Sequence, residues 1–107
     1  MKFQLSNCVA LGVSDMRKAA DFYEKTLGYE KGGEGSGWIE MRSGALRIFL
    51  CNDEVGEPTF DLQVDDVDKA VEYLMDSGFK RVVFDPNDKE SYMRDPYGYV
   101  YAISTKP

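Results

Sequence analysis

The sequence predicts an α+β fold made of two tandem modules, each with a strand, a helix and then about three strands. Three observations carry this prediction. One stretch of the chain is repeated after 51 residues, apolar residues alternate with the period of a strand in several places, and two segments space apolar residues along one helical face. At 107 residues the chain is expected to form a single domain, with modules at about 1–52 and 58–107.

The repeat consists of a strand that runs into an acidic residue and then a helix. Five residues of the first copy recur at a constant separation: Leu11, Val13, Asp15, Lys18 and Ala19 return as Leu62, Val64, Asp66, Lys69 and Ala70. Farther along, Met41-Arg42 is echoed by Met93-Arg94, and Gly44 is echoed by Gly98, where the separation has grown to 54 residues. Such drift is expected where the loops of a duplicated unit have gained residues.

In the first module, alternation predicts a strand with two distinct faces. Val9, Leu11 and Val13 are expected to pack under a helix, and Cys8, Ala10 and Gly12 to point the other way. Ser14 or Asp15 can cap a helix that begins near Met16, and Gly28 can end it. The apolar face of that helix is expected to comprise Ala19, Ala20, Tyr23 and Leu27.

Glycines and turn residues divide the rest of the first module. Residues 29–36 mix glycines with charges and predict a loop, with a short strand at 29–31 as the alternative. A phosphate-binding loop is not indicated, because no strand-to-helix context surrounds these glycines. Strands at 38–42 and 45–51 are expected to form a hairpin through Ser43-Gly44.

The second module is expected to repeat this order after a polar connector at 52–58. A strand at 59–64 precedes a helix that ends at Ser77-Gly78. The buried face of this helix is expected to comprise Val67, Ala70, Val71, Leu74 and Met75. The remaining strands are expected at 80–84, 91–94 and 99–104, with turns at Pro86-Asn87-Asp88 and Asp95-Pro96-Tyr97-Gly98.

The composition narrows the classes of function. The chain has no histidine, which removes Ser-His-Asp and Cys-His catalytic pairs and every imidazole metal site. Its net charge of −6 arises in residues 53–76, which carry −8, while the segments on either side carry +1 each. The acidic run forms either a solvated surface or a surface that attracts a cationic ligand. No basic patch suits nucleic acid and no apolar run is long enough to cross a membrane, so a cytoplasmic protein is expected.

Four short motifs follow one another along both modules: Leu11-x-Val13-Ser14-Asp15, Phe22-Tyr23-x-x-x-Leu27-Gly28-Tyr29, Val64-Asp65-Asp66 and Arg94-Asp95-Pro96-Tyr97-Gly98. In this order and spacing they resemble the vicinal oxygen chelate superfamily, which includes glyoxalases, extradiol dioxygenases and bleomycin-resistance proteins. The resemblance implies paired βαβββ modules that form a curved mixed sheet around a cleft. It also implies a homodimer, since the bleomycin-resistance relatives share their clefts between chains.

Enzymes of this superfamily usually hold a divalent metal through His, Gln or Glu on four strands. Transferred residue by residue, these positions fall on Cys8, Thr59 and Ala102, and on either Ile48 or Phe49. Ile, Phe and Ala offer no donor atom, and a neutral Thr hydroxyl is a poor ligand. The resemblance therefore implies a chain without the superfamily's metal, and no cofactor is expected.

Strand alternation and the aromatic residues indicate which side chains a ligand would meet. Alternation places Thr59, Asp61 and Gln63 toward the cleft, with Phe60, Leu62 and Val64 in the core. Alternatively, that face is only a solvent-exposed surface of the sheet, and each aromatic residue packs in the core. The candidate ligand-binding residues combine flat apolar walls with a few polar groups: Trp38, Glu40, Phe49, Asp61, Gln63, Tyr92 and Arg94.

Three functions remain open. The preferred one is a metal-free protein like the bleomycin-resistance branch, which sequesters a small, partly aromatic compound that is cationic if Glu40 and Asp61 face it. The second is a lyase or isomerase with an atypical site, in which Glu40, Asp61 or Cys8 acts as acid, base or nucleophile. The third is a domain used only for association. Cys8 and Cys51 are otherwise expected to be small apolar residues of the interior.

Overall fold

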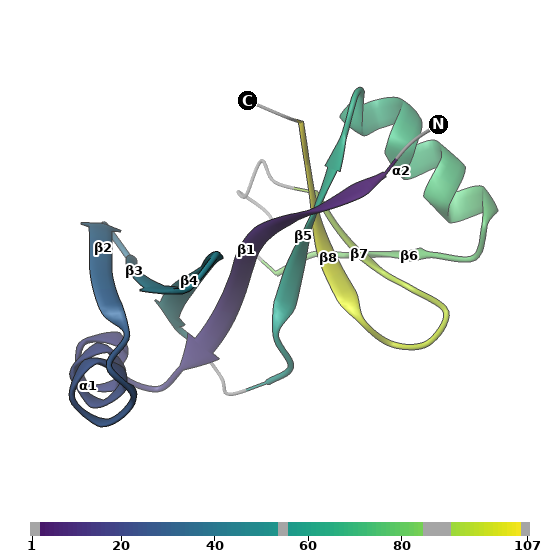
Figure 1. Cartoon of the computed structure of the whole chain (residues 1–107). Coiled ribbons are helices and arrows are strands. Elements are labelled where there is room, and N and C mark those ends of the chain that lie inside the picture. Colours follow the sequence, from purple (N-terminus) through teal and green to yellow (C-terminus); the bar gives the residue numbers. More distant parts are fainter. Residues whose placement is uncertain (1–2, 54–55, 85–90, 106–107) are drawn as a thin grey trace. The chain divides into compact units, whose positions relative to one another are not determined.

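The computed structural model describes residues 3–53, 56–84 and 91–105 (Figure 1). The first half contains β1 (Gln4–Val13), α1 (Met16–Phe22), a π-helical turn η1 (Tyr23–Leu27), β2 (Glu30–Gly35), β3 (Trp38–Ser43) and β4 (Leu46–Asn52). The second half contains β5 (Thr59–Val64), α2 (Val67–Asp76), β6 (Lys80–Val82), β7 (Ser91–Arg94) and β8 (Val100–Thr105). The predicted α+β class is confirmed.

The two halves share one topology. β1 pairs in parallel with β4, and β5 pairs in parallel with β8. The pairs β2–β3, β3–β4, β6–β7 and β7–β8 are antiparallel. The strand order of the mixed sheet is β2-β3-β4-β1-β5-β8-β7-β6, so each half is a βαβββ module, as the internal repeat predicts.

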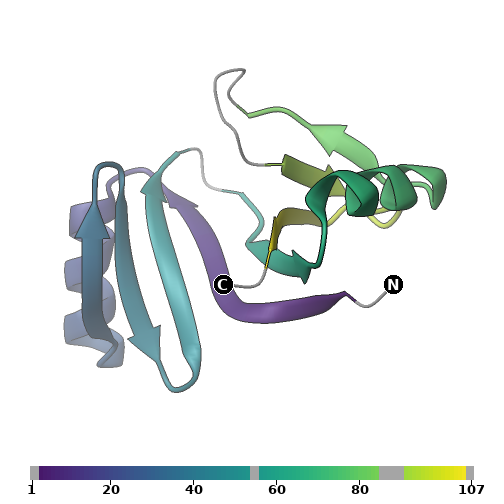
Figure 2. The same ribbon diagram turned by 90° about the horizontal axis from the view of Figure 1, so that it is seen from above.

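The chain divides into two compact units. The first unit comprises Asn7–Pro58, and the second unit joins Met1–Ser6 to Thr59–Pro107, so β1 contributes to both. In the first unit α1 packs on β3 and β4, and in the second unit α2 packs on β6, β7 and β8 (Figure 2). Each unit therefore has its own helix on one face of its strands.

Both helices begin in the same way. Asp15 and Asp66 have extended backbones, and Oδ1 of each carboxylate accepts a hydrogen bond at 3.1 Å, from the backbone N–H of Lys18 and Lys69 respectively. Each bond satisfies an N–H group that has no partner within the first helical turn. The repeated residues therefore perform the same task twice, and Asp15 is the cap of α1 in place of Ser14.

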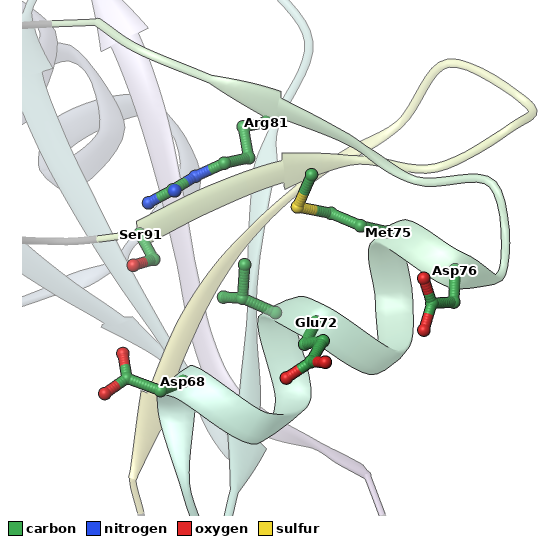
Figure 3. Close-up of a pocket in the computed structure, with 7 residues that line it drawn as sticks. Asp68, Glu72, Met75, Asp76, Arg81 and Ser91 are labelled. Atoms are coloured by element: carbon green, nitrogen blue, oxygen red, sulfur yellow. The ribbon is translucent and has the colours of Figure 1, made fainter.

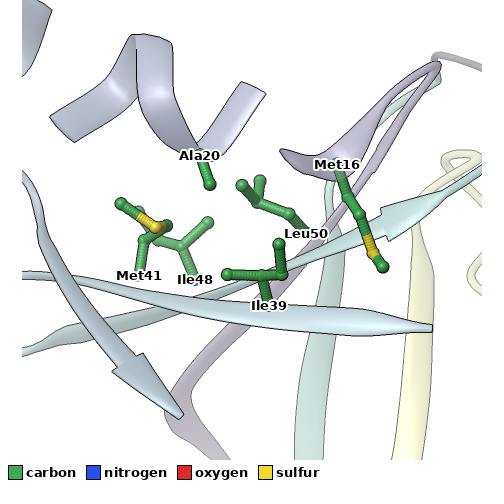
Figure 4. Close-up of a cluster of buried hydrophobic side chains, with 6 residues drawn as sticks. All are labelled: Met16, Ala20, Ile39, Met41, Ile48 and Leu50. Carbon is green, nitrogen blue, oxygen red and sulfur yellow. The ribbon is translucent and has the colours of Figure 1, made fainter. Parts of the chain in front are cut away.

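The core of the first unit lies between α1 and the strands β3 and β4 (Figure 4). Its buried side chains come from the helix and from alternate strand positions: Met16, Ala20, Ile39, Met41, Ile48 and Leu50. Val9, Leu11, Val13, Ala19 and Tyr23 pack against them, as predicted. Leu27 was predicted to join this face but is 54% exposed. It lies in the π-helical turn, whose wider spacing moves a residue off a stripe of 3.6-residue period.

The second unit has a separate core between α2 and its strands. The buried members are Val64, Ala70, Val71, Leu74, Met93 and Ile103, with Leu62 and Val67 packed against them. Met75, predicted for this face, is 49% exposed because its neighbour Leu74 occupies the core position of that turn. Phe60, also predicted for the core, is 36% exposed and contacts the ring of Tyr101 at the margin of the cluster.

The predicted loop at 29–36 is wrong over most of its length. Glu30–Gly35 form β2, which pairs antiparallel with β3. Glycine disfavours strands, but pairing with a well-packed neighbour overrides this preference. The register shifts between Lys31 and Glu34, where Gly32 and Gly33 accommodate the irregularity.

Two other boundaries differ from the predictions. Ser43 pairs with Leu46, so the β3–β4 hairpin turns at Gly44-Ala45, one residue later than predicted. β6 ends at Val82, before the predicted end at 84, and the predicted turn at Pro86-Asn87-Asp88 lies outside the described residues.

Within the described ranges, no helix is long and apolar enough to cross a membrane.

Candidate functional site

Three charged side chains meet on the sheet face of the first unit that lies opposite α1. Nε of Arg42 donates to Oε2 of Glu40 at 2.8 Å. Arg47 donates through Nε to Oε2 at 3.0 Å and through Nη2 to Oε1 at 3.2 Å. The β3–β4 register places Arg42 directly opposite Arg47, and alternation places Glu40 on the same face. We call these three residues the Arg–Glu–Arg cluster.

Glu40 is buried, with 3% of the residue exposed, yet its carboxyl group strongly favours the ionised form. Hydrogen bonds from Arg47 and, to a lesser extent, from Arg42 lower the pKa of Glu40 from 4.5 to about 2, although burial alone would raise it. The bond to Glu40 also raises the pKa of Arg47. At neutral pH the carboxylate is charged and its oxygens accept guanidinium N–H groups. It is therefore poorly suited to act as a general acid or base.

Two aromatic side chains continue this face beside the cluster. The guanidinium carbon of Arg47 lies 5.2 Å from the centroid of the Phe49 ring. Phe49 meets Trp38 edge to face, with 5.7 Å between the ring centroids. Phe49 is half-buried and Trp38 is 36% exposed, so both rings keep accessible surface. Three of the predicted site residues, Trp38, Glu40 and Phe49, therefore lie together.

The glycines of β2 leave room for these side chains. A Cβ atom on Gly32 would lie 2.8 Å from Cδ of Glu40, and a Cβ atom on Gly35 would overlap the indole ring of Trp38. A Cβ atom on Gly33 would also reach the indole, at 3.8 Å. Glu40 and Trp38 therefore pack against bare backbone, which only glycine permits at the two closest positions.

The other predicted site residues belong to the second unit. Asp61 pairs in register with Ala102, which also pairs with Tyr92, so the three residues share the face opposite α2. Oγ of Ser104 donates to Oδ1 of Asp61 at 2.8 Å, and Gln63 pairs with Ser104. Asp61, Gln63 and Tyr92 thus form a second polar and aromatic face, built like that of the first unit.

Two predicted residues of the second unit contact neighbours in their own unit. Tyr92 packs edge to face on Phe84, with 4.9 Å between the ring centroids. Nη1 of Arg94 donates to the carbonyl oxygen of Gly98 at 2.8 Å. Arg94 therefore braces the β7–β8 loop, a structural role that its selection as a ligand contact did not anticipate.

Asp95 organises the same loop. Its Oδ1 accepts the backbone N–H groups of Tyr97 and Tyr99 at 2.9 and 3.0 Å, and its Oδ2 accepts the Tyr101 hydroxyl at 3.0 Å. Burial would raise the pKa of Asp95, but these hydrogen bonds outweigh it and lower the pKa. The pKa of Tyr101 is raised mainly by burial and, to a lesser extent, by its hydrogen bond to Asp95. The motif that begins at Arg94 is therefore explained by loop closure.

A hollow of about 270 Å³ lies beside α2 in the second unit (Figure 3). It is lined by Asp68, Val71, Glu72, Met75, Asp76, Arg81 and Ser91. None of the predicted site residues lines it. Its three carboxylates lie on exposed helix positions one turn apart, which is typical of a solvated helix surface, so we do not assign a site there.

The superfamily's metal positions do not fit a metal in this chain. One of the four metal positions falls on either Ile48 or Phe49. Ile48 lies in the core with 7% exposure, whereas Phe49 faces the same side of the sheet as Cys8, so the position corresponds to Phe49. Phe49 and Ala102 have no donor atom, and Thr59 has a neutral hydroxyl. Across residues 3–53, 56–84 and 91–105, no three His, Cys, Asp or Glu residues group in a way that could hold a metal ion.

Arg42 and Arg47 are site residues that the sequence analysis did not select. The signal for them was present, because a hairpin between 38–42 and 45–51 brings the two arginines close, and alternation places Arg42 on the face of Glu40. A carboxylate considered without these neighbours suggests a cationic ligand. With both arginines, the cluster carries a net positive charge.

Comparison with known proteins places the fold. The chain matches the family model of the glyoxalase-like domain over residues 8–104. A hypothetical protein from Bacillus halodurans C-125 has a TM-score of 0.73 at 14% identity, over 100% of this chain and 97% of that one. A glyoxalase/bleomycin resistance protein/dioxygenase superfamily member from Vibrio splendidus 12B01 has a TM-score of 0.66 at 14% identity, over 95% and 97%.

A third solved structure is a methylmalonyl-CoA epimerase from Streptomyces coelicolor, with a TM-score of 0.70 at 14% identity, over 97% of this chain and 96% of that one. A search of the curated proteins finds no sequence match. Identities this low show a shared fold, whereas the family model spans nearly the whole sequence. The chain therefore belongs to the glyoxalase-like domain family, within the vicinal oxygen chelate superfamily that its motifs resemble.

Proposed function

We propose that the chain is a metal-independent binding protein for a small, partly aromatic compound, a role like that of bleomycin-resistance proteins. The observation that carries the proposal is the face of the first unit, where Trp38 and Phe49 lie beside a fixed charged cluster. Flat apolar surface with a few placed polar groups is typical of small-molecule sites. The side chains at the superfamily's metal positions favour binding over metal-dependent catalysis.

A cationic ligand, expected from Glu40 and Asp61, has weaker support than an aromatic one. Both oxygens of Glu40 accept hydrogen bonds from arginine, so its charge is compensated within the protein. Asp61 is then the carboxylate left to attract a cation, on the face of the second unit.

A lyase or isomerase activity is the alternative. Its specific support is Cys8, whose Sγ lies 3.9 Å from Nη1 of Arg47, so a sulfur atom that could act as nucleophile lies beside the Arg–Glu–Arg cluster. The epimerase among the similar structures supports only the fold. Binding is preferred because the pairing of Glu40 with two arginines removes one of the three proposed acid–base groups.

Trp38 is the single tryptophan of the chain, so its fluorescence reports directly on the proposed site. Among small aromatic compounds, a ligand should quench this fluorescence, and Trp38→Ala should weaken its binding by about tenfold or more in calorimetry, because an aromatic contact is lost. Tyr97→Ala, which removes an 87% exposed ring, should leave the affinity unchanged. A ligand that binds Trp38→Ala as tightly as the wild type would place the site elsewhere.

Two further parts of the proposal concern metal and assembly. Elemental analysis of the purified protein should find no stoichiometric divalent ion, and a tightly held ion would overturn metal independence. By analogy with the superfamily we propose a homodimer in the cytoplasm, which light scattering after size-exclusion chromatography tests through the mass in solution. A monomeric mass at micromolar concentration would reject the dimer.

A further inference from the structure

The Arg42 guanidinium has donors that find no acceptor among the described residues. Its Nε donates to Glu40, and the described residues supply no further side-chain partner for its two Nη nitrogens. The Arg42 side chain is 56% exposed. Arg47, by contrast, uses Nε and Nη2 on Glu40 and turns Nη1 toward Cys8. Arg42 is therefore the member of the cluster whose two Nη nitrogens both remain for a ligand.

The charge of the cluster also favours an anion. The β3–β4 register sets the two arginines directly opposite each other, and their guanidinium groups share one carboxylate, so the three residues carry a net charge of +1. Glu30 lies opposite Arg42 in the β2–β3 register but forms no ion pair with either arginine. Like charges in that arrangement repel, and Glu40 compensates only one of them. A second carboxylate beside the exposed edge of Arg42 would neutralise the cluster, and the planar guanidinium suits a carboxylate with two parallel hydrogen bonds.

The aromatic side chains define the rest of the ligand. From Arg47 the face continues to Phe49 and then to Trp38. The Arg47 guanidinium carbon lies 5.2 Å from the Phe49 ring centroid, and the centroids of Phe49 and Trp38 lie 5.7 Å apart. A ring attached directly to a carboxylate on Arg42 would extend along the same sheet face, where Phe49 lies opposite Glu40 and Trp38 follows on β3. We propose that the face binds a small aromatic carboxylate, with Arg42 as the anion contact and Trp38 and Phe49 as the ring contacts. This inference rests on the proposed binding function and replaces its cationic ligand with an anionic one.

Three matched probes test the inference: 4-nitrobenzoate, the neutral 4-nitrobenzamide and the cationic 4-nitrobenzylammonium. All three carry the same nitroaromatic ring, which quenches tryptophan, so Trp38 fluorescence follows each titration after correction with free tryptophan. The benzoate should bind at least about tenfold more tightly than the amide, the size expected for a hydrogen bond to a charged group. Its affinity should fall as NaCl is raised, because the attraction is ionic. Inorganic phosphate serves as a competitor that carries charge without a ring.

The decisive variant is Arg42→Gln, since it removes the positive charge and the guanidinium of Arg42 and leaves the two bonds from Arg47 to Glu40. It should lose the preference for benzoate over benzamide and keep the affinity for the amide. Arg17→Gln is the matched control, because it removes one positive charge from an exposed residue of α1 that pairs with Glu34 outside the cluster. It should keep the preference. Circular dichroism and Tm confirm that both variants fold.

Each outcome decides between the two proposals. Equal binding of benzoate and amide, or an unchanged preference in Arg42→Gln, overturns the anionic ligand and leaves aromatic binding standing. Tighter binding of the benzylammonium overturns the anionic ligand in favour of a cation. Competition by phosphate as strong as that by benzoate assigns the cluster to simple anions and rejects the aromatic part. If none of the three probes quenches Trp38, both the inference and the aromatic site of the proposed function fail.

Discussion

Glu40 shows how neighbouring residues change the meaning of a side chain. Alternation correctly places it on one face with Trp38 and Phe49, so the composition of that face is predictable from the sequence. The pairing of its carboxylate with Arg42 and Arg47 depends on the hairpin register and on side-chain torsions, which the sequence does not specify. From the sequence, Glu40 gives this face a negative charge, whereas Glu40 with Arg42 and Arg47 carries a net positive charge.

Replacing Glu40 by Gln should flatten the acid dependence of stability. The folded pKa of about 2 lies below the ordinary 4.5, so the ionised carboxylate stabilises the fold above pH 4.5, and this contribution is lost as the pH falls toward 2. In urea unfolding, the wild type should lose stability between about pH 5 and pH 2 more steeply than Glu40→Gln. The variant should also have a lower Tm at pH 7, because the opposed arginines lose their counterion. Equal acid dependence in the two proteins would contradict this electrostatic account.

At the scale of the element, the repeat predicted the helices better than their ends. α2 begins at the predicted Asp66, and α1 begins at Asp15, one of the two predicted caps, because capping is a local interaction that a short motif specifies. The exposure of Leu27 follows from a π-helical turn that periodicity does not reveal. Apart from the alternative strand at 29–31, β2 was predicted as a loop because of its glycines. Its structure comes from pairing with β3, an interaction between segments.

The caps offer a test at this scale. Asp66→Ala should lower the free energy of unfolding by about 1 kcal/mol, because the N–H of Lys69 loses its acceptor. Asp65→Ala, which removes the adjacent exposed carboxylate, should change it by less than about 0.5 kcal/mol. Chemical denaturation measures both variants. A loss in Asp65→Ala as large as that in Asp66→Ala would show that charge near the helix start, and not the capping bond, stabilises α2.

At the scale of the whole molecule, each unit has its own hydrophobic cluster, while the sequence predicts a single domain. β1 contributes residues to both units, which favours cooperative unfolding. Leu50 and Met93 are fully buried, one in each cluster. Leu50→Ala and Met93→Ala should each lower the free energy of unfolding by about 3 kcal/mol, because each leaves a cavity. Calorimetry should show one transition whose Tm falls in both variants. If hydrogen exchange accelerates only in the unit that carries the substitution, the units unfold separately and the single-domain prediction is wrong.

The glycines of β2 also constrain how this sequence can change over evolution. A side chain cannot be added at Gly32 while Glu40 keeps its position, nor at Gly35 while the indole of Trp38 covers it. A side chain at Gly32 or Gly35 would therefore displace Glu40 or the Trp38 indole from the positions that form the site. As long as the site is needed, the strand next to it stays poor in side chains. A side chain at either position is thus expected in relatives that have lost Glu40 or Trp38, or that hold these side chains in other rotamers.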